Sequence, residues 1–417
     1  MNTTTRKKIC DLSWFSPKSD RSKYFLYVLF FFCFEPKLFA KVPLLNGLFA
    51  GGAVACFVLM CGLYLSSRKK PSILLAAVVV YRLSFAIQTF TAPEGDVLMW
   101  GYMSIVLMTM CMAVDYYIAD KSREMIEAVT YLLVYLLVVN MVVSLFWPEG
   151  IFDMYFIGIR TRLTDLIIPM IVLALVLDWI DCRNMSFRTV AILLLAVLTV
   201  YQHTVMTAVL GLGIFAAFFA VFFFFRKKWV PRAVNVCTLA GVGLLLDTLI
   251  VHAKITLRME WFFVNVLNKT ATLTERMAIW ENAMVIIKDR IWLGHGMAEN
   301  GNFVPGPESL DASVLWQAHN QWIQLLYDGG LLAVVAFLAL ALLCHRGLRG
   351  NCPHRPRIAF LAGLLAFFVM MSVEIFSYTP YFFLLVFFGY HASTLRQSDE
   401  VRLGLVEQKA LKYSREQ

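Results

Sequence analysis

The sequence predicts an all-α, polytopic integral membrane protein. Apolar residues make up 60% of the 417-residue chain, charged residues only 16%, and the mean hydropathy is +0.69. Soluble domains contain about half apolar and about a quarter charged residues, so an ordinary soluble enzyme is excluded. The apolar residues also come in runs of roughly 20, the length that a helix needs to cross about 30 Å of hydrocarbon.

Twelve such runs follow one another, and each is expected to be a transmembrane helix. The first, near 24–40, follows a basic segment and contains Glu35, Pro36 and Lys37, so we expect a retained span and not a cleaved signal peptide. An even number of spans places both termini on one side. The other spans lie near 43–65, 72–91, 97–118, 125–147, 163–180, 189–205, 207–225, 233–251, 318–344, 358–377 and 380–395.

The basic residues orient these spans. With a cytoplasmic N-terminus, most of the 37 Lys and Arg residues fall in inward segments, with dense groups at 68–70 and 226–228. This is the positive-inside asymmetry of membrane proteins. The net charge of +9 therefore reports topology, and binding of nucleic acid is not expected.

The chain is accordingly predicted to contain five segments. They are a cytoplasmic N-terminal tail (1–23), transmembrane helices 1–9 (24–251), a large outward loop (252–317), transmembrane helices 10–12 (318–395) and a cytoplasmic C-terminal tail (396–417).

The large outward loop is expected to carry a helix over roughly 273–290. Thr272 and Glu275 have the spacing of a capping box, and apolar residues follow at helical intervals from Met277 to Ile287. Arg276 lies in the first turn of this helix. Its guanidinium group can bind a phosphate through two hydrogen bonds, or it is simply a solvated first-turn arginine.

His319 is the best candidate for a general base. It stands in the sequence AHNQW at 318–322, where the tenth span begins. Imidazole titrates near neutral pH and can take a proton from an attacking sugar hydroxyl. The alternative is a structural histidine that is hydrogen-bonded at the entrance of a helix.

Three further basic residues are candidates on the outward side. Arg160 and Arg162 lie at the outer end of the sixth span, where the positive-inside rule disfavours them, so they are expected to contact substrate or lipid headgroups. His203 lies in the tight turn predicted between spans seven and eight, either as a functional contact or as a simple turn histidine.

Several motifs are missing from the sequence. No D-x-D pair lies on the outward side, so a metal-dependent sugar transferase is not supported, and neither a metal nor a cofactor is expected. No Walker A sequence is present, so the chain lacks the motor of ATP-driven transport.

Two motifs resemble a known family. Arg276 opens the sequence RMAIWENA, and Ile286-Ile287 and the turn GHG at 294–296 follow, as in the periplasmic loop of the O-antigen ligase and polymerase superfamily. His319-Asn320, followed after nine residues by Gly330, looks like the histidine motif of that family, with Ala333 where glycine is more usual. Twelve spans with one large loop before the tenth also resemble the ligases.

The resemblance implies a glycosyltransferase of the bacterial inner membrane whose active site faces the periplasm. The donor would be a glycan on undecaprenyl diphosphate. The acceptor would be the lipid A–core in a ligase, or another lipid-linked glycan in a polymerase. By the same resemblance, His319 is the base, Arg276 holds the diphosphate and Asn320 contributes to substrate binding.

One position departs from the ligase pattern. Ligases usually carry an arginine near the outer boundary of spans seven and eight, but the sequence here is YQHTVM at 201–206. Either His203 takes part of that role, Arg160 or Arg162 replaces the arginine, or the chain is a polymerase with a different basic set.

A flippase or another transporter is the alternative from a different functional class. Such a protein is expected to carry charges in the middle of several spans. Here the candidates, which include Arg82, Asp165 and Glu374, mostly lie near predicted span ends, and the large loop favours surface chemistry.

Overall fold

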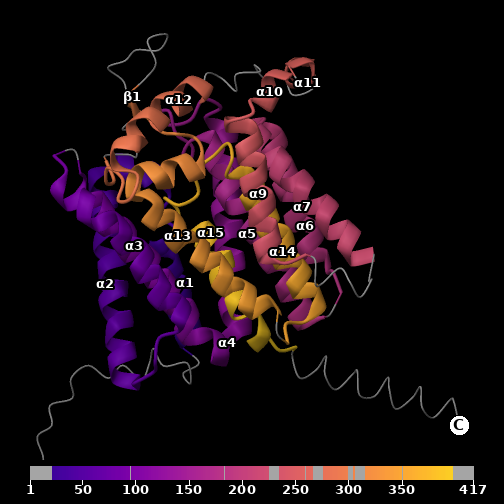
Figure 1. The fold of residues 1–417 in the computed structure, drawn as a ribbon. Helices are drawn as coiled ribbons and strands as arrows, with labels where there is room; N and C mark the ends of the chain where they lie inside the picture. The colour runs from indigo at the N-terminus through magenta and orange to yellow at the C-terminus, as the bar shows by residue number, and fades with distance from the viewer. Residues whose placement is uncertain are drawn as a thin grey trace, which may run out of the picture.

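The protein is a bundle of helices that run side by side, with short helices covering one end (Figure 1). The structure is a computed structural model. It describes residues 21–93, 95–182, 184–224, 234–258, 260–265, 276–298, 304–305, 315–349 and 351–397. Most of the two predicted tails, and the predicted capping box at 272–275, therefore lie outside the described residues.

The long helices follow the predicted spans in order. They are α1 (Ser22–Cys33), α2 (Pro43–Ser67), α3 (Ile73–Thr91), α4 (Val97–Phe146), α5 (Leu163–Asp181), α6 (Phe187–His203), α7 (Met206–Phe224), α9 (Val236–Val251), α13 (Gln321–Arg349), α14 (His354–Met370) and α15 (Tyr381–Tyr390). α4 covers two predicted spans. A non-helical residue, Lys121, separates the two halves of this helix, and each half corresponds to one span.

The all-α membrane class agrees with this architecture, whereas the number of spans stays a prediction. Five described helices are long and apolar enough to cross a membrane by length and composition. α1 and α15 contain only 12 and 10 residues, fewer than the roughly 20 that a perpendicular span needs. The two described strands, Val304–Pro305 and Leu315–Trp316, form one short antiparallel pair.

The bundle has an apolar exterior as well as an apolar core. Leu65, Leu98 and Phe187 each expose more than four-fifths of their surface, which suits contact with lipid and not with water. α5 and α15 are apolar on all sides and lie almost wholly inside the bundle. A helix that is hydrophobic all round is one that neighbouring helices cover.

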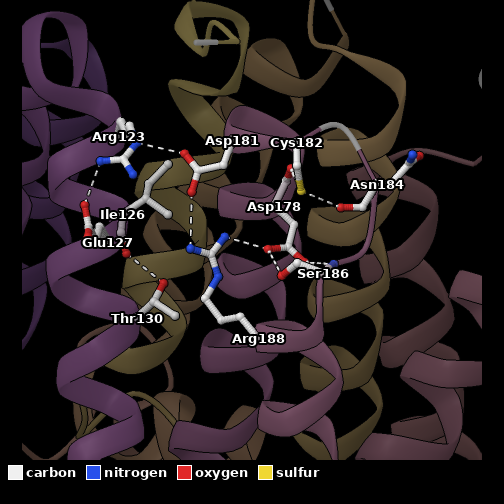
Figure 2. Close-up of polar contacts among 10 residues, drawn as sticks. All are labelled: Arg123, Ile126, Glu127, Thr130, Asp178, Asp181, Cys182, Asn184, Ser186 and Arg188. Atoms are coloured by element: carbon white, nitrogen blue, oxygen red, sulfur yellow. Dashed lines mark hydrogen bonds and ion pairs between the residues drawn. The ribbon is translucent and has the colours of Figure 1, made fainter. Parts of the chain in front are cut away.

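Charged side chains fasten the inward ends of three helices (Figure 2). Arg188 of α6 donates to Asp178 and Asp181 of α5 over 2.5 and 3.2 Å. Arg123 of α4 donates to Asp181 over 2.7 Å and to Glu127 over 2.9 Å. Every member has an opposite charge beside it, so this cluster braces the bundle.

The outward loop carries the expected helix. α12 (Arg276–Ile287) is followed by a 3-10 turn at Lys288–Arg290, close to the predicted 273–290. α10 (Ile255–Arg258) and α11 (Glu260–Asn265) lie on the same end of the bundle (Figure 1). Trp280 and Ile287 of α12 pack against Ile323 and Tyr327 of α13. This apolar contact fixes α12 on the outward end of α13.

The turn after α12 inserts into a break in α13. Gly330 interrupts this helix with φ 63° and ψ −161°, a conformation that only glycine adopts readily. The freed backbone groups pair with the turn: His295 N donates to Tyr327 O over 2.7 Å, and Leu331 N donates to Ile291 O over 2.8 Å. A Cβ atom added to Gly330 would lie 2.4 Å from the carbonyl carbon of Trp292.

Replacing this glycine is expected to destabilise the outward end of the bundle. Gly330→Ala introduces both a forbidden backbone conformation and a backbone clash, with a strain of about 1–3 kcal/mol. The purified protein in detergent should melt several degrees below the wild type. Gly213→Ala in α7 is the control, because a Cβ there meets nothing within 4 Å. Equal melting temperatures for Gly330→Ala and the wild type would show that the break does not need glycine.

Candidate active site

The turn between α14 and α15, residues 371–380, is contacted by three of the candidate basic residues, His319, Arg276 and Arg162. Glu374, at its centre, has a side chain that is only 3% exposed. Nδ1 of His319 lies 3.6 Å from Glu374 Oε1, just beyond a normal hydrogen bond. Nη2 of Arg276 lies 3.9 Å from the other oxygen, and Nη1 of Arg276 donates to the carbonyl of Val373. His319 and Arg276 therefore face the same carboxylate.

Arg162 reaches the same turn from α5. It ends the 3-10 turn Arg160–Arg162, and its Nη1 donates to Ile375 O over 3.2 Å. The same nitrogen lies 3.5 Å from Asp165 Oδ2. Three basic residues from distant parts of the sequence thus converge on residues 373–375.

The backbone of His319 is held on both sides. His319 itself has φ 47°, in the left-handed region that few non-glycine residues occupy. The indole Nε1 of Trp280 donates to Ala318 O over 2.6 Å, so α12 grips the preceding residue. Such a conformation persists where the surroundings fix it, and it is common at functional sites.

Asn320, the residue after His319, is held by hydrogen bonds of its side chain. Its Oδ1 accepts hydrogen bonds from the backbone N–H groups of Trp322 and Ile323, so it acts as the N-cap of α13. Its Nδ2 donates to Asp247 of α9 over 2.5 Å and to Ser372 O over 3.1 Å. Asn320 is fully buried, and its side chain thus joins three elements beneath His319.

The 371–380 turn is also bonded along its length to α13. Gln321 Oε1 accepts from the N–H groups of Phe376 and Ser377 over 2.7 and 2.9 Å. The Tyr378 hydroxyl donates to Asp328 over 2.7 Å. These contacts hold Glu374 rigidly opposite His319.

Glu374 stays ionised in these surroundings. Burial raises its pKa, but the facing His319 imidazole and the positive charges of Arg162 and Arg276 lower it more, so that the pKa falls below its ordinary value. A carboxylate beside Nδ1 favours the tautomer that keeps the proton there, which leaves Nε2 with a lone pair. His319 is thus oriented to accept a proton at Nε2.

Arg160 and His203 form a neighbouring group. Nε of Arg160 donates to the Tyr155 hydroxyl over 3.2 Å, and the Tyr155 ring packs edge-on against His203 with centroids 4.7 Å apart. Within the described part of the chain, no hydrogen bond or ion pair links these two residues to His319 or Glu374. Of the two candidate arginines, Arg162 joins the site directly.

Glu374 is the site residue that sequence reasoning missed. It falls inside the predicted span 358–377, where the sequence alone offers it only as a charge that a transporter could use. In the structure α14 ends at Met370, so Glu374 lies in a turn. The available signal was a lone carboxylate in an apolar run, which favours a functional role.

Comparison with known proteins agrees with the resemblance noted in the sequence. Residues 189–338, about a third of the chain, match the family model described as O-antigen ligase. This range contains His203, Arg276, His319 and Asn320, whereas Arg162 and Glu374 lie outside it. No curated protein matched the chain. Over residues 189–338 the chain is therefore similar to the O-antigen ligase-like superfamily.

Proposed function

We propose that this protein is an O-antigen ligase of the bacterial inner membrane. It transfers a glycan from undecaprenyl diphosphate to the lipid A–core on the periplasmic face, without a metal ion. The observation that carries this proposal is the grouping of His319, Glu374, Arg276 and Arg162 around one turn. Such a group combines an oriented base with cations for an anionic leaving group.

The proposed reaction is a single displacement at the anomeric carbon. Nε2 of His319 takes the proton of the acceptor hydroxyl, while the Glu374 carboxylate stabilises the imidazolium that forms. The acceptor oxygen bonds to the anomeric carbon as the bond to the diphosphate oxygen breaks. The leaving diphosphate keeps the electron pair, and the configuration at the anomeric carbon is inverted.

Arg276 and Arg162 are proposed to compensate the charge of the leaving diphosphate. Their side chains are 22% and 17% exposed, so they are partly dehydrated and still reachable. Fixed cations in such a cleft stabilise developing negative charge more strongly than water does. Each guanidinium group has five N–H donors, so the bonds to the turn leave others for phosphate oxygens.

The remaining candidates receive different proposed roles. Arg160 is exposed beside Tyr155 and His203 at the outer boundary, which suits contact with the phosphate of an approaching donor. Asn320 has both polar atoms bonded within the protein, so we propose that it positions His319 and does not touch substrate.

A repeat-unit polymerase is the second candidate. The segment 201–206 lacks the arginine usual in ligases, and His203 packs on Tyr155 instead. In a polymerase the same four residues would act on a second lipid-linked glycan as acceptor.

Lipopolysaccharide from a deletion strain tests this function. The ligase proposal predicts lipid A–core without O-antigen and accumulation of lipid-linked polymer. A core that carries a single repeat unit would instead indicate a polymerase, and absence of periplasmic lipid-linked glycan would indicate a flippase. Complementation with His319→Ala should give normal protein in the membrane but transfer reduced by about 10²–10⁴-fold. Complementation with His252→Ala, an exposed histidine at the end of α9, is the control.

Arg276→Lys tests the diphosphate role. Lysine keeps the positive charge but loses the planar fork, so transfer should fall by about ten-fold or more. The rate is measured in membrane vesicles with the lipid-linked donor. Arg290→Lys, in the 3-10 turn after α12, is the matched control and should retain wild-type activity. Full activity of Arg276→Lys would argue against bidentate binding.

A further inference from the structure

A cavity of about 210 Å³ lies beside the site, against the other side of Arg162. Its walls come from α1, α3, α4 and α5 and from the 371–380 turn. Arg162 is shared, because its Nη1 contacts both Asp165 in the cavity wall and Ile375 O. His319, Arg276 and Glu374 do not line the cavity, so it is adjacent to the site and distinct from it.

Two buried carboxylates of this cavity are only half satisfied. Asp165 is fully buried, and the side chain of Glu35 is 5% exposed. Asp165 Oδ2 faces Arg162, and Glu35 Oε2 accepts from the Tyr102 hydroxyl over 2.8 Å and lies 3.6 Å from Lys37 Nζ. The second oxygens, Asp165 Oδ1 and Glu35 Oε1, have no hydrogen-bond partner among the residues that the structure describes. Buried acceptors without a donor are rare and call for one from outside.

The cavity offers hydrogen-bond donors as well as acceptors. Arg82 is only 4% exposed, and its bonds go to Ser104 Oγ, Trp100 O and Met297 Sδ. Within the described ranges no carboxylate lies within ion-pair distance of it. Arg82, Arg162 and the two carboxylates therefore present both kinds of polar group to one space.

Apolar side chains also line the cavity. Met99, Met103 and Leu107 of α4 line it together with Phe34. At 1.5 Å per residue, the stretch from Met99 to Leu107 extends about 12 Å along the helix. The cavity thus combines polar side chains near the ends of α1 and α5 and on α3 with apolar side chains of α4.

We propose that this cavity binds a sugar ring of a lipid-linked glycan, an inference that rests on the proposed function. A sugar ring carries hydroxyls that both donate and accept, and it has an apolar face that packs on aromatic and aliphatic side chains. A bare diphosphate or a lipid tail has no donor to offer, so either would leave the free oxygens of Glu35 and Asp165 unpaired. The sugar belongs to either the donor or the acceptor, since both present this chemistry.

Photo-crosslinking locates the sugar without requiring turnover. Full-length protein carrying photo-methionine is placed in lipid vesicles with either undecaprenyl-diphosphate-linked O-antigen or lipid A–core, and crosslinked peptides are identified by mass spectrometry. Adducts that contain sugar are expected at Met99 and Met103. Met185, exposed at the inward end, serves as the internal control. The probe that gives the adducts identifies the bound glycan as donor or acceptor.

A charge-removing variant tests the carboxylates. Glu35→Gln keeps an acceptor for Tyr102 but loses the charge, so half-maximal crosslinking should need about ten-fold more glycan. Glu124→Gln, in the inward half of α4, is the matched control and should behave as the wild type. Sugar adducts no more frequent at Met99 and Met103 than at Met185, or an unchanged Glu35→Gln variant, would overturn the proposal.

The same measurement in a His319→Ala background separates this inference from the proposed function. Adducts there with normal O-antigen on the gel would mean that the cavity binds sugar while the assigned base is wrong. Missing adducts in a protein whose transfer depends on His319 would reject the cavity alone.

Discussion

The buried carboxylate of Glu374 is the interaction on which the rest of the outward side depends. Removing a carboxylate from water costs several kcal/mol unless opposite charges and donors surround it. Arg276 and Arg162 supply these charges, and the His319 ring faces the same carboxylate from a third element. Glu374 can therefore be buried as an anion only when α12, α13 and the start of α5 assemble around the 371–380 turn. Formation of the site and folding of this end of the bundle are one event.

This assembly explains what the residues of the two motifs do in the structure. The glycine of the histidine motif breaks α13, and the turn that contains Gly294 and Gly296 fills the break. This contact fixes α12, whose first residue is Arg276 and whose Trp280 holds the residue before His319. Two motifs separated in the sequence thus encode one rigid unit. Its purpose is to hold an imidazole and a guanidinium group at fixed distances from one carboxylate.

The sequence predicts the helical membrane class and α12 and points to His319 and Arg276 as candidates, because apolar runs, helical spacing and residue chemistry are local signals. It could not distinguish Arg162 from Arg160. In a 3-10 turn, side chains two positions apart point to different sides, and only a neighbouring turn decides which one is used. Glu374 could not be recognised from the sequence, because the apolar residues on both sides of it form one continuous predicted span. The role of Asn320 as a cap, and the cavity at Glu35 and Asp165, depend on helices that are distant in sequence.

The central claim is that Glu374 acts through His319. A double-mutant cycle tests it most directly, with transfer rates measured in membrane vesicles for Glu374→Gln, His319→Ala and the double variant. If the carboxylate serves the imidazole, the double variant should be no slower than His319→Ala alone, because groups that act as a unit are strongly non-additive. Rate losses that multiply in the double variant would contradict this account and would give Glu374 a separate role.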